Sequence, residues 1–298
     1  MKKIISVISS LVLAAGMTSA LAANAADDYK PYFYFKAEAG TGVEVLKHGA
    51  VYINNSVSGA NASIPVSAYF KDDQKIAGQI FVKWNCEKKE LQLKDATGGF
   101  TKAGNIPYKI SGANKDSDLV NLIKIFDDLN MVSVNYTETD ATKPLQLTGD
   151  TSDAYPIACF NAVFKDNAPA GSYDINFYSQ GAYFTSVIPR YADDPSKIIE
   201  VNPAEYSEGL RINASDRLLG DINNDGKINA VDASQILSAY AKNSTSQPTG
   251  LTPEQEAAAD VDGNKKFDSV DASNVLAYYA YTGSGHDDKS LNQFIKGE

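Results

Sequence analysis

Two copies of one sequence unit near the C-terminus decide the fold of that part of the chain. The first copy reads DINNDGKINAVDASQILSAYAK at Asp221–Lys242, and the second reads DVDGNKKFDSVDASNVLAYYAY at Asp260–Tyr281. The second copy begins 39 residues after the first and repeats the block VDAS with the Leu, Tyr and Ala that follow it. A repeat of this kind indicates that one structural unit occurs twice.

Each copy opens with the oxygen pattern of a calcium-binding loop. Oxygens at loop positions 1, 3 and 5, a backbone carbonyl at position 7 and a carboxylate at position 12 surround a hard cation. Both copies meet this spacing at equivalent points, so we predict two calcium ions. The predicted ligands are Asp221, Asn223, Asp225, the Lys227 carbonyl and Asp232 in the first loop, and Asp260, Asp262, Asn264, the Lys266 carbonyl and Asp271 in the second.

Loop position 6 distinguishes the two copies. The chain turns sharply there and favours a positive φ, which glycine adopts freely. The first loop has Gly226 at this position, whereas the second has Lys265. A lysine held at positive φ costs on the order of 1 kcal/mol, and its charge lies near the ion. The second site is therefore expected either to be the weaker one or to adjust its turn.

The predicted helices differ from those of an EF-hand. Such a motif has a helix before its loop, and Arg211–Gly220 lacks the apolar stripe of one. Thr252, Pro253 and Gln255 predict the N-cap and first turn of a short middle helix. A longer helix is expected after each loop, with one apolar face formed by Ala233, Ile236, Leu237 and Tyr240, and in the second copy by Ala272, Val275, Leu276 and Tyr279.

Together these features resemble the dockerin family of cellulosomes, over about residues 218–281. Dockerins carry two loop–helix calcium repeats, end each loop in Asp and bind cohesins. The resemblance implies a small all-α calcium-binding domain that contacts a cohesin through loop positions 10 and 11 and an exposed helix face. The corresponding residues are Ala230, Val231, Leu237, Ser238, Lys242, Ser269, Val270, Leu276, Ala277 and Tyr281. Leu237 and Leu276 are equally compatible with a core position.

The residues from about 32 to 213 follow a different pattern. Short runs alternate apolar and polar residues, and clusters of Gly, Asn, Asp and Pro separate them. This pattern predicts an antiparallel β-sandwich. The clearest runs are Ile64–Phe70, Gln79–Asn85, Met131–Tyr136, Ile157–Phe164 and Ser172–Tyr178. One stretch, Ser117–Leu129, has helical spacing and predicts a helix across one edge.

Parts of this region resemble the cohesin family. The similar runs are IPVSAYF at 64–70, IAGQIFVKWN at 76–85 and EGLRIN at 208–213. The resemblance implies a jelly-roll sandwich in which one flat sheet face receives a dockerin. The residues expected on that face are Phe81, Lys83, Asn85, Ser133 and Asn135. We thus predict a cohesin-like domain at 26–213 and a dockerin at 214–298, joined by a short connection.

Residues 1–25 have the features of a secretory signal peptide. Lys2 and Lys3 precede an apolar run, and Ala23-Asn24-Ala25 provides a cleavage site with small residues. The run is shorter than the roughly 20 residues that span a bilayer. We expect a secreted, extracellular protein associated with a cellulosome. Export permits a disulfide between Cys86 and Cys159, and two buried free thiols are equally compatible.

Charge and residue types argue against several other functions. The formal net charge is −10, and it becomes −12 when residues 1–25, with their two lysines, are removed. A chain this acidic does not suit nucleic acid or an anionic membrane surface. Two histidines, His48 and His286, leave little for a zinc site or for histidine-based catalysis. No pair of carboxylates lies on a predicted inner face, as glycoside hydrolysis would need.

The resemblances leave two main interpretations. A cohesin-like domain followed by a dockerin resembles a small adaptor scaffoldin, which is non-catalytic and monomeric before assembly. Such an adaptor docks into a cohesin of a larger scaffoldin and presents its own cohesin to a dockerin-bearing enzyme. The alternative is a dockerin-borne carbohydrate-binding protein or, less favoured, a small glycoside hydrolase. A carbohydrate platform would use aromatic residues such as those of Tyr32–Phe35, or Tyr178, Tyr183 and Phe184.

Overall fold

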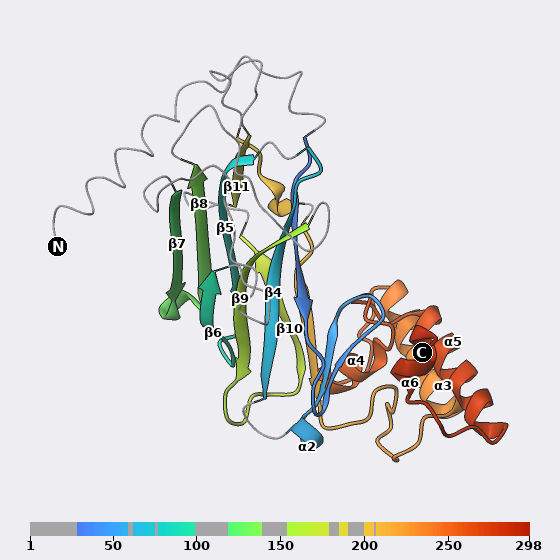
Figure 1. The fold of residues 1–298 in the computed structure, drawn as a ribbon. Helices are drawn as coiled ribbons and strands as arrows, with labels where there is room; N and C mark the ends of the chain where they lie inside the picture. Colours follow the sequence, from blue (N-terminus) through green and yellow to red (C-terminus); the bar gives the residue numbers. More distant parts are fainter. Residues whose placement is uncertain are drawn as a thin grey trace.

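The structure is a computed structural model that describes residues 29–58, 62–74, 77–98, 119–138, 154–178, 185–189, 200–205 and 207–298. The predicted signal peptide, Tyr183 and Phe184 lie outside these residues. Figure 1 shows a β-sandwich with a helical domain packed beside one end of it. Among the described helices, none is both long enough and apolar enough to cross a bilayer.

The described strands form two sheets, as predicted for a sandwich. The four-stranded sheet has the order β1-β4-β9-β6, and the eight-stranded sheet has the order β2-β3-β12-β10-β5-β8-β7, with β11 also paired to β5. The strands are β1 (Tyr32–Ala37), β2 (Val43–Val45), β3 (Val51–Asn54), β4 (Ser63–Lys71), β5 (Ala77–Cys86), β6 (Leu91–Gly98), β7 (Leu119–Phe126), β8 (Met131–Glu138), β9 (Ala154–Phe164), β10 (Gly171–Phe177), β11 (Ser186–Pro189) and β12 (Leu210–Ser215). Most pairs are antiparallel, and β3 pairs with β12 in parallel.

Alternation along the strands places one face of each sheet in a shared core. On β5, the side chains of Ile80, Val82 and Trp84 are fully buried between the sheets. Aromatic rings fill the space between layers, and the Phe35 ring stacks on the Phe177 ring with centroids 4.5 Å apart. Burial of apolar surface on this scale is the main force that holds the sandwich together. The predicted mainly-β domain is confirmed.

The helix predicted over Ser117–Leu129 is wrong, because most of this stretch is strand β7. Leu119–Phe126 pairs with β8 over its full length, from Leu119 opposite Glu138 to Phe126 opposite Met131. Ile123 and Ile125 pack against the core while Lys124 between them is exposed, which is the alternation of a strand. The apolar spacing fits both periods, and β-branched residues together with sheet pairing favour the strand. Among the described residues of this stretch, only the 3-10 turn η1 (Asp127–Leu129) is helical, and residues 117 and 118 lie outside the description.

The C-terminal domain is helical, as predicted. Its helices are α3 (Ala230–Ser244), α4 (Pro253–Ala259), α5 (Ser269–Gly283) and α6 (Leu291–Lys296), whereas the sandwich has the single-turn helix α2 (Asn55–Ser58) and the 3-10 turn η3 (Pro203–Glu205). The predicted start of the middle helix is correct: Thr252 caps α4, and its side chain and that of Gln255 form a capping box. Such reciprocal caps satisfy backbone N–H groups that a helix leaves free at its start.

The helical domain shares its core with the sandwich. Ile222, Ile236, Val261 and Val275 are fully buried there. Leu46 and Tyr52 belong to the same cluster, although they come from the β2–β3 hairpin (residues 43–54). The hairpin thus contributes apolar surface to a domain more than 160 residues away in sequence. The Tyr52 hydroxyl also donates a hydrogen bond to the Arg217 carbonyl at 2.9 Å.

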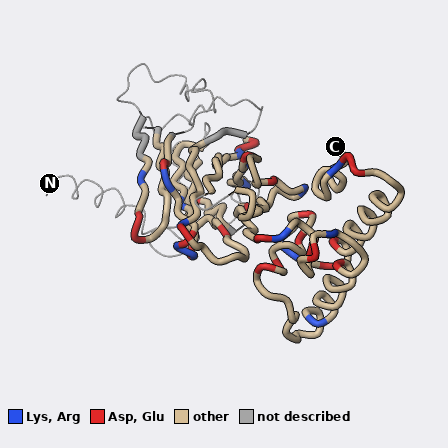
Figure 2. Tube along the Cα trace, turned by 90° about the horizontal axis from the view of Figure 1, so that it is seen from below, with Lys and Arg blue, Asp and Glu red and all other residues tan. Residues whose placement is uncertain are grey.

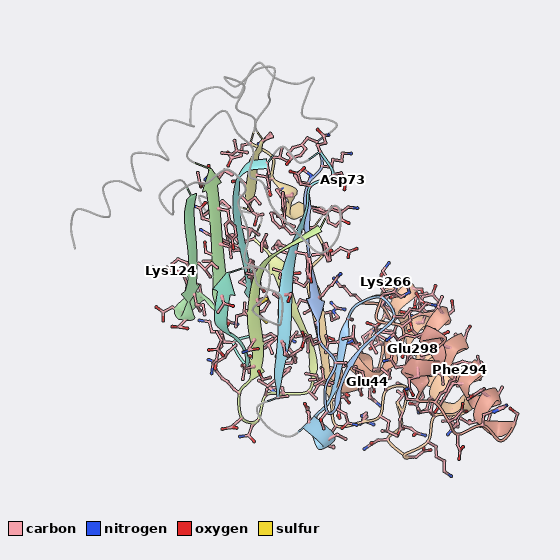
Figure 3. The ribbon with its side chains drawn as sticks, in the orientation of Figure 1. Glu44, Asp73, Lys124, Lys266, Phe294 and Glu298 are labelled. Atoms are coloured by element: carbon pink, nitrogen blue, oxygen red, sulfur yellow. The ribbon has the colours of Figure 1, made fainter. Side chains whose placement is uncertain are left out.

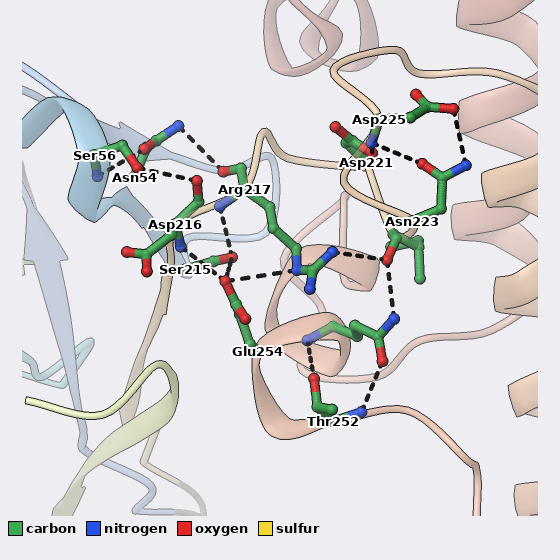
Figure 4. Close-up of polar contacts among 12 residues, drawn as sticks. Asn54, Ser56, Ser215, Asp216, Arg217, Asp221, Asn223, Asp225, Thr252 and Glu254 are labelled. Atoms are coloured by element: carbon green, nitrogen blue, oxygen red, sulfur yellow. Dashed lines mark hydrogen bonds and ion pairs between the residues drawn. The ribbon is translucent and has the colours of Figure 1, made fainter.

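A polar network fixes the connection between the two domains (Figure 4). The Glu254 carboxylate of α4 accepts from the Asp216 backbone N–H at 3.1 Å and lies 3.5 Å from Arg217 Nε. Arg217 also donates through Nη1 to the Ile222 carbonyl at 3.1 Å. From the sandwich side, Asn54 Nδ2 donates to the Arg217 carbonyl at 3.1 Å. The connection is therefore an ordered part of the junction.

The two cysteines are free thiols. Cys86 on β5 is buried, and Cys159 on β9 is partly exposed. The strands belong to different sheets, and no disulfide joins them. Burial raises the pKa of the Cys86 thiol to about 11. Of the two arrangements compatible with the sequence, the structure has the free thiols.

Candidate calcium centres and docking surfaces

Loop 1, Asp221–Asp232, is organised by hydrogen bonds from its own backbone to its acidic side chains. The Asp221 carboxylate accepts from the backbone N–H groups of Asp225 at 3.2 Å and Gly226 at 2.8 Å. Asn223 Oδ1 accepts from Asp225 N at 3.0 Å, and Asp225 Oδ1 accepts from Lys227 N at 2.9 Å. The loop thus bends around side-chain oxygens at positions 1, 3 and 5, as a calcium loop requires.

Asp232 at position 12 links loop 1 to the helix that follows. Its Oδ1 accepts from the N–H groups of Ile222 and Asn223 at 2.9 and 3.3 Å. Its Oδ2 accepts from Asn229 N at 2.9 Å, while the Asn229 side chain accepts from Val231 N and caps α3. Asn229, at position 9, therefore serves as the helix cap. The same arrangement recurs in the second copy with Asp268 and Asp271.

Loop 2, Asp260–Asp271, brings three carboxylates together in a buried place. One oxygen each from Asp260, Asp262 and Asp271 lies within 4.8 Å of the others, and all three residues are at most 3% exposed. Burial and the neighbouring Asp262 charge raise the pKa of Asp260 to about 6, and burial raises the pKa of Asp271 to about 7. Carboxylates this close and this buried repel one another unless a cation joins them.

The hydrogen bonding of the two Asp260 carboxylate oxygens indicates whether a cation fits in loop 2. Asp260 Oδ2 accepts from Lys265 N at 3.0 Å, but Asp260 Oδ1 is buried and has no hydrogen-bond partner. An orphaned buried acceptor among other carboxylates is what a hard divalent ion would satisfy. The residues present therefore fit Ca²⁺, which would be held by oxygens of the predicted ligands.

The backbone of both loops enters the left-handed region at positions 4 and 6. Asn224 and Gly226 have φ of +60° and +79° in loop 1, and Gly263 and Lys265 have φ of +78° and +72° in loop 2. Lys265 thus adopts the conformation that we predicted to be strained. The two loops share one backbone path and place glycine at different points of it.

Two apolar patches lie exposed on the helices after the loops. The first patch is Val231, Leu237 and Tyr240, which are 52%, 41% and 39% exposed. The second patch is the equivalent set in the repeat, Val270, Leu276 and Tyr279, at 51%, 42% and 47%. The single apolar face predicted for each helix is therefore wrong in part: Leu237, Tyr240 and their counterparts face solvent. The buried side of α3 is formed by Ala233, Ile236 and Ala239.

The other residues predicted to contact a cohesin lie mostly at the surface. Tyr281 is half-buried, because its ring stacks on His286 and its hydroxyl donates to Asp288. The tyrosines Tyr240 and Tyr279 were missed as surface residues, although their repetition at one position of both helices was a usable signal. Besides the patch residues, the exposed members of the predicted set are Ala230, Ser238, Lys242, Ser269 and Ala277.

The sheet face expected to receive a dockerin is only partly open. Lys83 and Ser133 are buried, at 4% and 8% exposure, and so are not available as predicted. The Lys83 carbonyl accepts from Tyr178 N at 2.8 Å, and the Lys83 N–H donates to the hydroxyl of Thr185 at 3.2 Å. Burial lowers the pKa of Lys83 to about 8. Phe81, Asn85 and Asn135 remain half-exposed.

The aromatic run considered as a carbohydrate platform is partly built into the core. Phe33 is fully buried, and Phe35 packs against the core. The Tyr34 ring stacks on the Tyr69 ring at 5.2 Å, and Lys36 Nζ lies 4.7 Å above the Tyr69 ring. These ring faces are occupied by neighbours of the same chain.

Comparison with known proteins identifies the helical part. The dockerin type I domain model matches residues 219–278, which confirms the predicted dockerin. No curated protein matches the chain.

Several solved cohesin structures resemble the chain distantly. A chain of the type I cohesin–dockerin complex Coh-OlpA-Doc918 from Clostridium thermocellum is 12% identical with a TM-score of 0.38, and the match covers 62% of this chain and 99% of that one. A type III cohesin of the ScaE cell-surface anchoring scaffoldin of Ruminococcus flavefaciens is 12% identical with a TM-score of 0.38, over 64% and 90%. The seventh ScaB type I cohesin of Pseudobacteroides cellulosolvens is 13% identical with a TM-score of 0.36, over 62% and 92%. Similarity this distant gives no information about what the sandwich binds.

Proposed function

We propose that this protein is a non-catalytic adaptor of a cellulosome. Its dockerin docks into a cohesin of a larger scaffoldin, while its sandwich acts as a cohesin and binds a dockerin-bearing enzyme. Cohesin and dockerin modules are non-catalytic interaction domains of the extracellular cellulosome. Residues 1–25 are then a signal peptide, 26–213 the cohesin-like domain and 214–298 the dockerin.

The paired exposed patches on α3 and α5 carry this proposal. Large apolar side chains that remain 39–52% exposed at repeated positions mark a surface that a partner covers. Each patch begins one residue before the last aspartate of its loop, at Val231 and Val270. Calcium held by the ten predicted ligands, five to each loop, fixes these helix starts and thus shapes the surface.

The arrangement of the domains supports binding of two partners at once. The helical domain packs beside the end of the sandwich that carries the β2–β3 hairpin, where Glu44 lies in Figure 3. The sheet edge with Lys124 on β7 lies on the far side of the sandwich in the same view. A dockerin bound at the β5–β8 face, through Phe81, Asn85 and Asn135, leaves both helix patches accessible.

The test is calorimetric titration of the chain 26–298, with calcium, against panels of cohesins, dockerins and polysaccharides. We expect submicromolar binding of at least one cohesin and one dockerin. The double variant Leu237→Asp/Leu276→Asp should lose cohesin binding by roughly 1000-fold or more, because two buried interface anchors at about 2–4 kcal/mol each are removed. Leu129→Asp is the matched control, since Leu129 is 58% exposed outside the patches.

Each outcome separates the candidates. Loss of cohesin binding in the double variant but not in Leu129→Asp supports the helix patches, and each single variant shows whether one or both patches are used. Binding of polysaccharide with no response to any dockerin would replace the adaptor by the carbohydrate-binding alternative.

A further inference from the structure

Loop 2 forms direct hydrogen bonds with the sandwich, whereas loop 1 reaches it only through the shared apolar core and the connection. The backbone N–H of His48, in the β2–β3 hairpin, donates to the carbonyl of Asp262 at 3.0 Å. Next to it, Gly263 lies so close to the hairpin that a Cβ there would be 2.6 Å from the Cβ of Leu46. Of the described sandwich residues, none hydrogen-bonds to loop 1. The nearest polar link is Arg217, in the connection, to the Ile222 carbonyl.

A reciprocal pair of contacts holds the position-6 lysine of loop 2. Lys265 Nζ donates to the Gly209 carbonyl of the sandwich at 2.6 Å. In return, Arg211 on β12 donates through Nη1 to the Lys265 carbonyl at 2.9 Å. The Arg211 guanidinium is itself fixed by two bonds to the Asp174 carboxylate, at 2.8 and 2.9 Å. Figure 2 shows basic and acidic residues side by side where the two domains meet.

The sandwich also reaches the first predicted ligand of loop 2. Asn213 on β12 is 1% exposed, and its Nδ2 lies 3.5 Å from Asp260 Oδ2. The core that holds Leu46 and Tyr52 includes Val261 of loop 2 and also Ile222 of loop 1, so apolar packing alone does not distinguish the loops. Asn292 of α6 adds a further bond between the domains, from its Nδ2 to the Val45 carbonyl at 3.2 Å. Loop 2 is therefore contacted by the sandwich through backbone, charged, polar and apolar groups.

We infer that calcium binding in loop 2 and docking of the helical domain onto the sandwich are one coupled equilibrium, while loop 1 binds its ion independently of the sandwich. If docking holds loop 2 in its binding conformation, then by linkage the ion stabilises the docked arrangement by the same free energy. Calcium would thus fix the orientation of the helix patches relative to the sandwich. This inference rests on the proposed calcium sites and goes beyond them, because a dockerin could bind calcium with no such coupling.

Hydrogen exchange of the hairpin tests the coupling in the chain 26–298. We expect calcium to slow amide exchange in residues 43–54 by roughly fivefold or more. A factor of about five lies at the low end of the affinity changes that coupling between two sites typically produces. Asp262→Ala removes a predicted ligand of loop 2, and the matched control Asn223→Ala removes the same position of loop 1. Both side chains accept from the N–H two residues later at 3.0 Å, so both variants lose the same local bond.

The expected result is that calcium still slows hairpin exchange in Asn223→Ala but not in Asp262→Ala. Equal slowing in the two variants would overturn the coupling. Calorimetry of the unmodified chain keeps the two proposals apart, because absence of any calcium binding there contradicts the sites themselves.

A second variant covers the case in which Asp262→Ala does not fold. Arg211→Gln lies in the sandwich, is not itself a predicted ligand and cuts the contact with the Lys265 carbonyl. Because the Arg211 charge also acts on Asp260, its loss alone would favour a bound cation, so a weaker site reports the lost contact. We expect it to weaken one calcium site by roughly fivefold or more and to leave the other unchanged. Lys124→Gln, at the far sheet edge, is the control. Two unchanged sites in Arg211→Gln would contradict the inference.

Discussion

The two calcium loops share one sequence unit and one backbone path, yet they occupy different surroundings. At positions 3 and 4 of loop 1, Asn223 is partly exposed and Asn224 faces solvent. At the same positions of loop 2, Asp262 and Gly263 are buried against the hairpin of the sandwich. The hydrogen bonds that shape the two loops are nearly the same. In each loop, the carboxylate of the aspartate at position 12 accepts from the backbone N–H groups of positions 2, 3 and 9. The ligand pattern therefore sets local geometry, and the neighbouring domain decides how much of that geometry is pre-organised.

Removing calcium should have the largest effect, because it empties both loops at once. Without an ion, the buried carboxylates of loop 2 repel one another, and the small helical core cannot offset this. We expect excess chelator to remove most of the helical circular dichroism of the chain 26–298. Added calcium should restore it.

The chain carries its own control for this experiment. Its one tryptophan, Trp84, is fully buried in the sandwich core. Tryptophan fluorescence should therefore remain unchanged while helicity is lost. Unchanged helicity in chelator would contradict the calcium assignment, and a simultaneous change of fluorescence would show that the sandwich depends on the ions as well.

Much of the loop geometry could be predicted from sequence, because calcium ligands follow fixed spacing along a short segment. The carboxylate at position 12 accepts hydrogen bonds from backbone groups of its own loop. The positive φ of Lys265 could be predicted because Gly226 stands at the same position in the other copy. Alternation likewise predicted β4, β5, β8, β9 and β10. These features depend on residues close together in the chain.

The features that escaped prediction depend on partners distant in sequence. Ser117–Leu129 has apolar residues that suit a helix or a strand, and pairing with β8 decides between them. Lys83 is buried where its backbone bonds to Tyr178 and Thr185, which are distant from it in sequence. The insertion of Leu46 and Tyr52 into the helical core has no signal in the hairpin itself, because both are ordinary apolar residues of a strand region.

Exchanging position 4 between the loops should give the next largest effect. Gly263→Asn forces a Cβ to 2.6 Å from Leu46 Cβ and 3.2 Å from Ala50 Cβ, and both residues are only 2% exposed. Overpacking of this kind costs about 1–3 kcal/mol. The reciprocal change, Asn224→Gly in loop 1, keeps a residue that tolerates positive φ and should alter stability by only a few tenths of a kcal/mol.

Thermal unfolding with saturating calcium measures both variants. A large loss in Gly263→Asn beside a small change in Asn224→Gly confirms that only loop 2 is packed against the sandwich. Equal and small changes in the two variants would mean that the hairpin does not hold loop 2 closely in solution.

Position 6 offers the smallest and most informative comparison. Lys265→Gly relieves the positive φ, worth about 1 kcal/mol or roughly fivefold in calcium affinity, but it also removes the bond from Lys265 Nζ to Gly209. Lys265→Ala removes the same bond and keeps the strain. We therefore expect the glycine variant to bind calcium in loop 2 more tightly than the alanine variant, as calorimetry of the two sites can measure. Equal affinities would show that Lys265 is not strained.

The reciprocal change then separates strain from docking as the cause of any difference between the loops. Gly226→Lys gives loop 1 the same residue at φ of +79°, where a Cβ meets no neighbouring atom within 4 Å. If position 6 alone distinguishes the loops, the double variant Gly226→Lys/Lys265→Gly should simply exchange their two affinities. If the sandwich pre-organises loop 2, its affinity should rise above the value that loop 1 has in the unmodified chain, because loop 2 then combines a relaxed backbone with the contacts of Arg211 and the hairpin. A simple exchange of the two values would leave the sandwich without a role in calcium binding.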